Sequence, residues 1–172
     1  MAIKEKELYE PVRTALERSF AAIGKRTVSE TGATKGLGEP LKALIPPGLE
    51  ILFRFLSRKP DIAGYVESNL GNVIFTAEVK RGSLTIQDIY QAKMYKELFG
   101  ATFGFLIGTE PVTEELKRLL RAIPIILMSA GDYTFHFLAI ARFDLDSGTF
   151  VEWFLNLQPD TDPFAHLKRL SF

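Results

Sequence analysis

Two short apolar runs, each with an acid at one end, place the strongest constraint on the fold. Residues 61–66 and 73–79 have the composition of β-strands, and the polar, glycine-containing segment 68–72 between them predicts a hairpin. Asp61 begins the first run and Glu78 lies near the end of the second. Antiparallel pairing of the two runs would therefore bring both acids to the same end of the hairpin.

This pattern indicates a site for a divalent metal ion. Two carboxylates at close range repel each other unless a cation lies between them, and carboxylate oxygens suit Mg²⁺, with Mn²⁺ able to replace it. Lys80 is two residues beyond Glu78 on the same strand, so both side chains point to one face. We therefore predict that Asp61 and Glu78 hold the ion. Lys80 would neutralise phosphate charge or orient the attacking water.

Each part of the pattern is common when taken alone. Glu115 and Lys117 repeat the Glu-x-Lys spacing within a predicted helix, and Pro159-Asp160 repeats the Pro-Asp pair near the C-terminus. Only the copy at Pro60-Asp61 and Glu78-Val79-Lys80 stands on two runs joined by a hairpin. The joint arrangement therefore supports the site more strongly than either motif does.

Two predicted helices supply further candidates. Thr85 and Asp88 resemble a capping box that opens a helix ending before Gly100. Gln91 and Tyr95 share one face of it, where Gln91 could bind a water or a phosphate, or could simply be solvated beside a partly buried tyrosine. A first helix is predicted over residues 4–22, starting near Leu8 or bending there because of Pro11. It carries Glu7 and Glu10, which either reach the metal's outer shell or belong to a solvated face.

The remaining elements complete an α/β pattern. We predict a loop over 30–48 with a short helix from Pro40 to Leu44, strands at 51–56, 103–107 and 125–128, a helix at 113–122, a hairpin of 133–143 with 149–157, and a helical turn after Pro163. This order predicts a mixed β-sheet flanked by helices, with an additional C-terminal β-hairpin. The length predicts a single domain over residues 1–172.

Composition excludes several classes of protein. The chain has no cysteine, which excludes disulfides, thiolate metal sites and cysteine nucleophiles and suits the cytoplasm. Its N-terminus is charged, unlike a signal peptide, and no apolar run is long enough to span a membrane. Lys plus Arg and Asp plus Glu both number 21, which counts against tight nonspecific binding of nucleic acid. Many basic residues nevertheless fall in the first hundred positions.

The C-terminal hairpin is rich in large apolar residues, more than one face of a small sheet needs. We predict from this that the chain forms a homodimer. The alternative is a sheet that one chain buries on both of its faces.

Together the motif residues resemble the PD-(D/E)xK nuclease superfamily over roughly residues 4–108. Gln91-x-x-x-Tyr95 resembles the motif of its RecB-like branch, and Glu7, with Glu10 as the alternative, resembles the helix glutamate of the Holliday-junction resolvases. The resemblance implies a restriction-endonuclease-like fold and a Mg²⁺-dependent deoxyribonuclease. Asp61, Glu78, Lys80, Gln91 and Glu7 would be its catalytic residues.

Substrate contacts are assigned to Tyr95, Arg81 and Lys59. The chain departs from the family in its long segment 30–48 and in lacking a target-recognition region, so a protein partner could supply specificity. Two other functions stay open: an inactive nucleic-acid-binding or assembly module that keeps the nuclease fold, and a metal-dependent hydrolase that acts on RNA.

Overall fold

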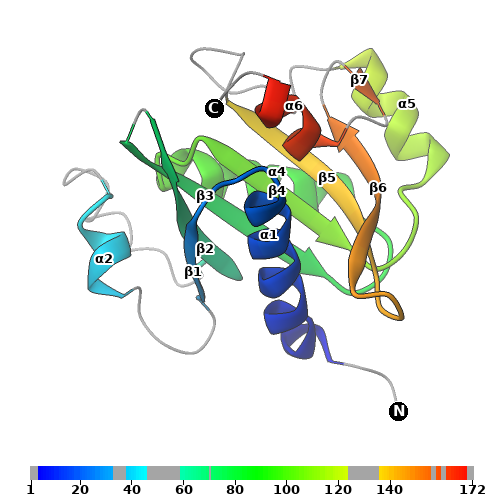
Figure 1. Ribbon diagram of the computed structural model, residues 1–172. Helices are drawn as coiled ribbons and strands as arrows, with labels where there is room; N and C mark the ends of the chain where they lie inside the picture. The colour runs from blue at the N-terminus through cyan, green and yellow to red at the C-terminus, as the bar shows by residue number, and fades with distance from the viewer. Residues whose placement is uncertain are drawn as a thin grey trace.

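The computed structural model describes residues 4–32, 38–45, 59–69, 71–123, 136–155, 158–159 and 162–169. Across these residues the chain forms a mixed sheet of six strands, which a two-residue strand extends at one edge (Figure 1). Helices cover both faces of the sheet. The predicted α/β class, with a mixed sheet flanked by helices, is confirmed.

The strands lie side by side in chain order, and the direction of pairing changes twice. β1 to β3 are antiparallel, β3 to β5 are parallel, and β5 to β7 are antiparallel. The parallel step from β3 to β4 is made by the crossover helix α4, as parallel pairing requires. The strands are β1 (Thr27–Thr31), β2 (Ile62–Ser68), β3 (Gly71–Lys80), β4 (Phe103–Gly108), β5 (Phe137–Asp144), β6 (Thr149–Leu155) and β7 (Gln158–Pro159). The helices are the 3₁₀-helix η1 (Glu5–Leu8), α1 (Tyr9–Ala22), α2 (Glu39–Lys42), α4 (Ile86–Leu98), α5 (Glu114–Ala122) and α6 (Pro163–Arg169).

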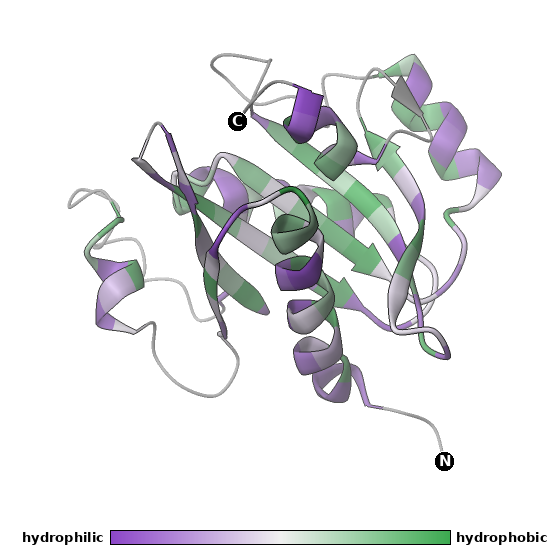
Figure 2. Cartoon of the chain, viewed as in Figure 1, coloured by the Kyte–Doolittle hydropathy of each residue, from purple (hydrophilic) through white to green (hydrophobic). Residues whose placement is uncertain are grey.

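The core has two main parts, one on each face of the sheet. Side chains of α1 and α6 pack on one face around Phe20, Phe75 and Phe105, and side chains of α4 and α5 pack on the other around Leu106 and Ile140. All six residues of β4 are buried, and hydrophobic colour runs along the central strands in Figure 2. The sheet is therefore covered by its own chain on both sides.

This packing bears on the predicted homodimer. Successive residues of β5 alternate between the two cores: Phe137 and Ala139 face α1, while Leu138 and Ile140 face α4 and α5. The described apolar residues of β5 are thus used within one chain, in agreement with the alternative interpretation. Homodimerisation stays a prediction, and the mass measured by light scattering at micromolar concentration tests it.

Short-range sequence signals predicted the positions of the described helices well. α1 begins at Tyr9, next to Leu8 where the proline suggested a start, and α4 opens with the predicted capping box of Thr85 and Asp88. Thr113 caps α5 through its hydroxyl, which accepts a hydrogen bond from the amide of Leu116. These ends depend on side chains next to the helix in sequence, and sequence analysis can therefore find them.

One strand was not predicted, and two predicted strands cannot be compared. β1 pairs with β2 through the backbone, and its end falls in the segment that we expected to be a loop. Its sequence, TVSET, lacks an apolar alternation because an edge strand buries little. The predicted strands at 51–56 and 125–128 lie outside the described residues. Of the helices in the described part of the chain, none is long and apolar enough to cross a membrane.

Candidate active site

The β2–β3 hairpin brings Asp61 and Glu78 together. Ile62 pairs with Ala77, so Asp61, one residue before β2, lies level with Glu78 near the end of β3. The amide of Asp61 donates to Oε1 of Glu78 over 3.3 Å, and the amide of Val79 donates to Oδ2 of Asp61 over 2.9 Å. Each carboxylate is therefore held by backbone beside the other, as the sequence predicted for these two acids.

Two further polar side chains converge on Glu78. The ammonium of Lys80 lies 3.6 Å from Oε2 of Glu78, and the Nε2 group of Gln91 donates to the same oxygen over 3.0 Å. Gln91 comes from the face of α4 that packs on the sheet. The structure thus brings together four residues singled out from the sequence, Asp61, Glu78, Lys80 and Gln91.

Burial controls the protonation of both acids. Glu78 is only 2% exposed, and burial raises its pKa to about 8, with the charge of Asp61 acting in the same direction and Lys80 opposing it. Burial also raises the pKa of Asp61, against the hydrogen bonds from Tyr9 and the Val79 amide and the charge of Lys80. Without a cation, the pair therefore retains a proton near neutral pH.

Tyr9 is a member of the site that sequence analysis missed. It lies at the start of α1, is 6% exposed, and its hydroxyl makes a hydrogen bond with Asp61. Burial and the nearby charge of Asp61 both raise the pKa of Tyr9, so the hydroxyl keeps its proton and acts as a donor. The available signal was weak: Tyr9 begins the apolar stripe of Val12 and Leu16, and a buried tyrosine needs a partner for its hydroxyl.

The predicted helix glutamates, Glu7 and Glu10, have local partners in the structure. Glu7 is exposed, and its carboxylate accepts a hydrogen bond from the amide of Lys4 over 2.9 Å. Glu10 is also exposed and forms an ion pair with Arg13. The acid of this region whose charge acts on both Tyr9 and Asp61 is Glu5, in η1.

The residues assigned to the substrate differ in their positions. Lys59 and Arg81 are exposed, each directly beside a segment that carries a site residue, and are accessible to a ligand. Tyr95 is 1% exposed and packs among Ala63, Ile74 and Phe99. Its burial argues against the predicted substrate contact, because reaching a ligand would require α4 to move away from the sheet.

The chemistry of the donors fits a Mg²⁺ ion. No group of three or more acidic or histidine side chains suited to a metal occurs in the described ranges. Mg²⁺ does not require one, since it commonly uses one or two carboxylates and keeps several waters or takes substrate oxygens. Two carboxylates with raised pKa values, of which Glu78 is buried and Asp61 is partly buried, repel each other and form a pair that a divalent cation would stabilise.

Comparison with known proteins adds no further information. No protein-family model matches the chain, and no curated protein or solved structure is significantly similar to it.

Proposed function

We propose that this protein is a divalent-metal-dependent nuclease that hydrolyses phosphodiester bonds, most readily in DNA. The observation that carries the proposal is the hydrogen-bonded pair of Asp61 and Glu78, with the ammonium of Lys80 3.6 Å from Glu78. We also infer a restriction-endonuclease-like fold of the PD-(D/E)xK type. Support comes from the position of these acids, with Asp61 directly before β2 and Glu78 near the end of the adjacent strand β3. The preference for DNA follows from the resemblance to deoxyribonucleases.

The proposed roles follow from the contacts. Asp61 and Glu78 would hold Mg²⁺, which when bound lowers the pKa of a coordinated water and offsets the charge of a phosphate. Gln91 and Tyr9 keep the two carboxylates oriented, because each donates to one of them. The Lys80 side chain is 19% exposed, so its ammonium can face both Glu78 and a phosphate at the surface. There it would stabilise the negative charge that develops during hydrolysis.

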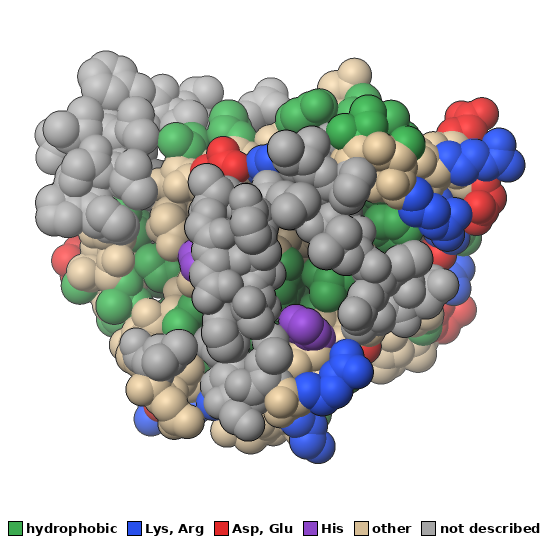
Figure 3. All heavy atoms as spheres, turned by 90° about the horizontal axis from the view of Figure 1, so that it is seen from above, with side chains coloured by type: hydrophobic (Ala, Val, Ile, Leu, Met, Phe, Trp, Pro, Cys, Tyr) green, Lys and Arg blue, Asp and Glu red, His purple; other side chains and the backbone are tan. Residues whose placement is uncertain are grey.

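Surface charge limits how the substrate is held. In Figure 3, acidic and basic side chains alternate along the right-hand edge, consistent with a net charge of zero. Lys96 is 2% exposed, so its side chain is enclosed by the protein and is not accessible to a phosphate. Lys59 and Arg81 are the exposed cations nearest in sequence to the site residues. We expect modest, salt-sensitive affinity, which a protein partner would strengthen.

Cleavage assays on the purified chain test the proposal. Labelled single-stranded, duplex and branched DNA, and RNA, are incubated with Mg²⁺, Mn²⁺, Ca²⁺ or EDTA. We expect cleavage in Mg²⁺ or Mn²⁺, none in EDTA, and a loss of at least about 10³-fold in Asp61→Asn and Glu78→Gln. The matched control is Glu115→Gln, which alters the exposed Glu-x-Lys copy on α5 and should leave the rate unchanged. Equal rates in wild type and Glu78→Gln would contradict the site.

One observation favours a second function, a nucleic-acid-binding module without turnover. Glu78 is 2% exposed, and two donors already use its oxygens. Because its pKa is raised to about 8, the metal-free side chain is mostly protonated at neutral pH. Binding in Ca²⁺ without cleavage of any substrate in Mg²⁺ or Mn²⁺ would support this second function over the first.

A further inference from the structure

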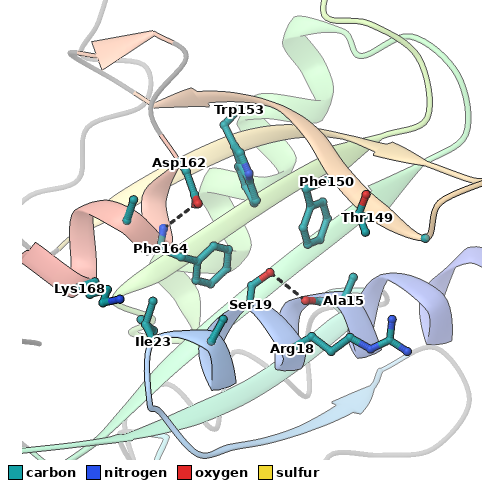
Figure 4. Close-up of a pocket in the computed structure, with 13 residues that line it drawn as sticks. Ala15, Arg18, Ser19, Ile23, Thr149, Phe150, Trp153, Asp162, Phe164 and Lys168 are labelled. Atoms are coloured by element: carbon teal, nitrogen blue, oxygen red, sulfur yellow. Dashed lines mark hydrogen bonds between the residues drawn. The ribbon is translucent and has the colours of Figure 1, made fainter.

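A hollow of about 450 Å³ lies on the α1 face of the sheet (Figure 4). Its walls come from the second half of α1, the start of β6 and α6, and neither Asp61 nor Glu78 lines it. The volume is in the range of small-molecule sites. We call this feature the aromatic hollow, after Phe150, Trp153 and Phe164, which line it.

The three rings form a connected wall. The ring centres of Phe150 and Trp153 are 4.9 Å apart, and those of Trp153 and Phe164 are 5.6 Å apart. Figure 4 shows all three side chains directed toward the space above α1. Phe150 and Trp153 are only partly buried, so part of their ring surface faces the hollow. Flat aromatic ligands stack on such surfaces, and every nucleobase presents a face of this kind.

The mouth of the hollow favours an anion. Arg18 on α1 and Lys168 on α6 line it from two sides, and both side chains are exposed. None of the ion pairs between described residues uses either of them. The acid in the lining, Asp162, accepts a hydrogen bond from the amide of Phe164 over 2.9 Å, at the start of α6. Two exposed cations therefore line the hollow at opposite ends, and a backbone amide holds the carboxylate of Asp162.

We propose that the aromatic hollow binds a nucleotide. The base stacks against Phe150 and Trp153, and the positive charges of Arg18 and Lys168, at the two ends of the hollow, attract the phosphate. Ser19 and Thr149 contribute hydroxyls to the lining that can meet polar edges of the base or sugar. The same chemistry is available from a free mononucleotide and from an unpaired nucleotide of a strand.

This proposal goes beyond the proposed nuclease activity and stands without it. Arg18 is nine residues from Tyr9, which is roughly 13 Å along the axis of α1. The hollow is therefore a second site, and its occupation requires no metal ion. If the chain is a nuclease, an unpaired nucleotide held here would anchor the strand that reaches the acidic pair.

Trp153 makes the test direct, because it is the single tryptophan of the chain. Its fluorescence is followed during titration with deoxyadenosine monophosphate in EDTA. We expect a saturable change that deoxyadenosine reproduces only at about tenfold or higher concentration and that inorganic phosphate does not produce, since the ligand needs both base and phosphate. Arg18→Ala and Lys168→Ala should each weaken binding about tenfold, as expected for a lost phosphate contact of this kind.

Control variants separate this site from the acidic pair. Arg121→Ala removes an exposed cation on α5 and should leave the affinity unchanged. Glu78→Gln should also bind deoxyadenosine monophosphate normally. Retained nucleotide binding with lost cleavage would show that nucleotide binding at the aromatic hollow does not depend on the acidic pair. Circular dichroism melting of each variant checks that the fold is intact.

A second arm distinguishes the two sources of the nucleotide. A short oligodeoxyadenylate that binds at least about tenfold tighter than the mononucleotide would identify a strand as the ligand, and equal affinities would identify the free nucleotide. Either result supports the proposal. A saturable signal that persists in the double variant Arg18→Glu/Lys168→Glu would overturn it. The absence of a saturable signal with both the mononucleotide and the oligonucleotide would also overturn the proposal. This holds even if the hollow binds an uncharged apolar dye.

Discussion

Backbone hydrogen bonds hold Asp61 and Glu78 beside each other although their charges repel. The amide of Asp61 donates to Glu78, and the carboxylate of Asp61 accepts from the amide that follows Glu78. Two hydrogen bonds therefore position a pair of acids whose charges repel. This conflict between position and charge is the main reason to expect a cation at the site.

The stability of the metal-free protein should fall as pH rises. Burial raises the folded-state pKa of Glu78 to about 8 from 4.5, so its contribution is complete below pH 4.5 and is lost as pH rises through about 8. The change in the free energy of unfolding is on the order of a few kcal/mol, since one pKa unit corresponds to about 1.4 kcal/mol. Urea unfolding in EDTA between pH 5 and pH 9 measures it.

The Glu78→Gln variant provides the comparison for this pH dependence. A neutral amide cannot ionise, so the variant should lose most of the slope and be more stable than wild type at pH 9. Glu115→Gln, at an exposed position, should keep the wild-type slope. A wild-type slope that survives in Glu78→Gln would show that another group causes it.

Tyr9→Phe should weaken the metal site while preserving the packing of α1. The hydroxyl of Tyr9 lowers the pKa of Asp61, so its removal raises that pKa further and disfavours the charged form that binds a cation. We expect several-fold weaker Mg²⁺ binding at pH 7, measured by the shift in melting temperature with Mg²⁺ concentration. Tyr90→Phe is the matched control, because Tyr90 is 56% exposed. Equal Mg²⁺ affinities in the two variants would remove Tyr9 from the site.

Gln91→Leu should destabilise the fold through Glu78. It removes the donor that lies 3.0 Å from a buried carboxylate oxygen, which typically costs about 1–3 kcal/mol. The loss should be larger at pH 9 than at pH 5, because the charged carboxylate depends more on its donors. Gln87→Leu on the exposed side of α4 is the control, and chemical unfolding of both variants measures the difference. An unchanged stability at pH 9 would mean that the hydrogen bond contributes little.

Lys80→Ala should impair the chemical step more than binding. Its ammonium lies beside Glu78, where one positioned charge near a reacting phosphate is worth about 10²–10³ in rate. Affinity measured in Ca²⁺ should change much less, because other contacts share it. Arg81→Ala should do the opposite, weakening binding and leaving the single-turnover rate at saturation unchanged. A large loss of affinity with a normal single-turnover rate in Lys80→Ala would make Lys80 a phosphate anchor only.

Much of the candidate site could be predicted because it lies within one local unit. The hairpin register follows from two apolar runs and a short turn. The position of Asp61 opposite Glu78 could therefore be predicted before the fold was known. Lys80 follows from the two-residue period of a strand. Gln91 follows from the capped helix that comes directly after β3, and in the structure its amide donates to Glu78.

The residues that the first helix contributes to the site could not be predicted in the same way. Which acid of the first helix faces the site depends on how α1 rotates as it packs on the sheet, and that rotation is set by contacts of Val12, Leu16 and Phe20 with distant strands. Helical spacing alone allowed Glu7 or Glu10. Packing instead brings the charge of Glu5 and the hydroxyl of Tyr9 to Asp61.

By itself, the sequence determined the class of the fold, the described helix ends and the pairing of the two acids, because these depend on residues close together in the chain. Tertiary structure decided the rest. The burial that raises the pKa of Glu78, the enclosure of Tyr95, the edge strand β1 and the aromatic hollow between α1, β6 and α6 all arise where distant segments meet. Burial and charge at such places are sums over many distant neighbours, and only the packed chain determines which neighbours those are.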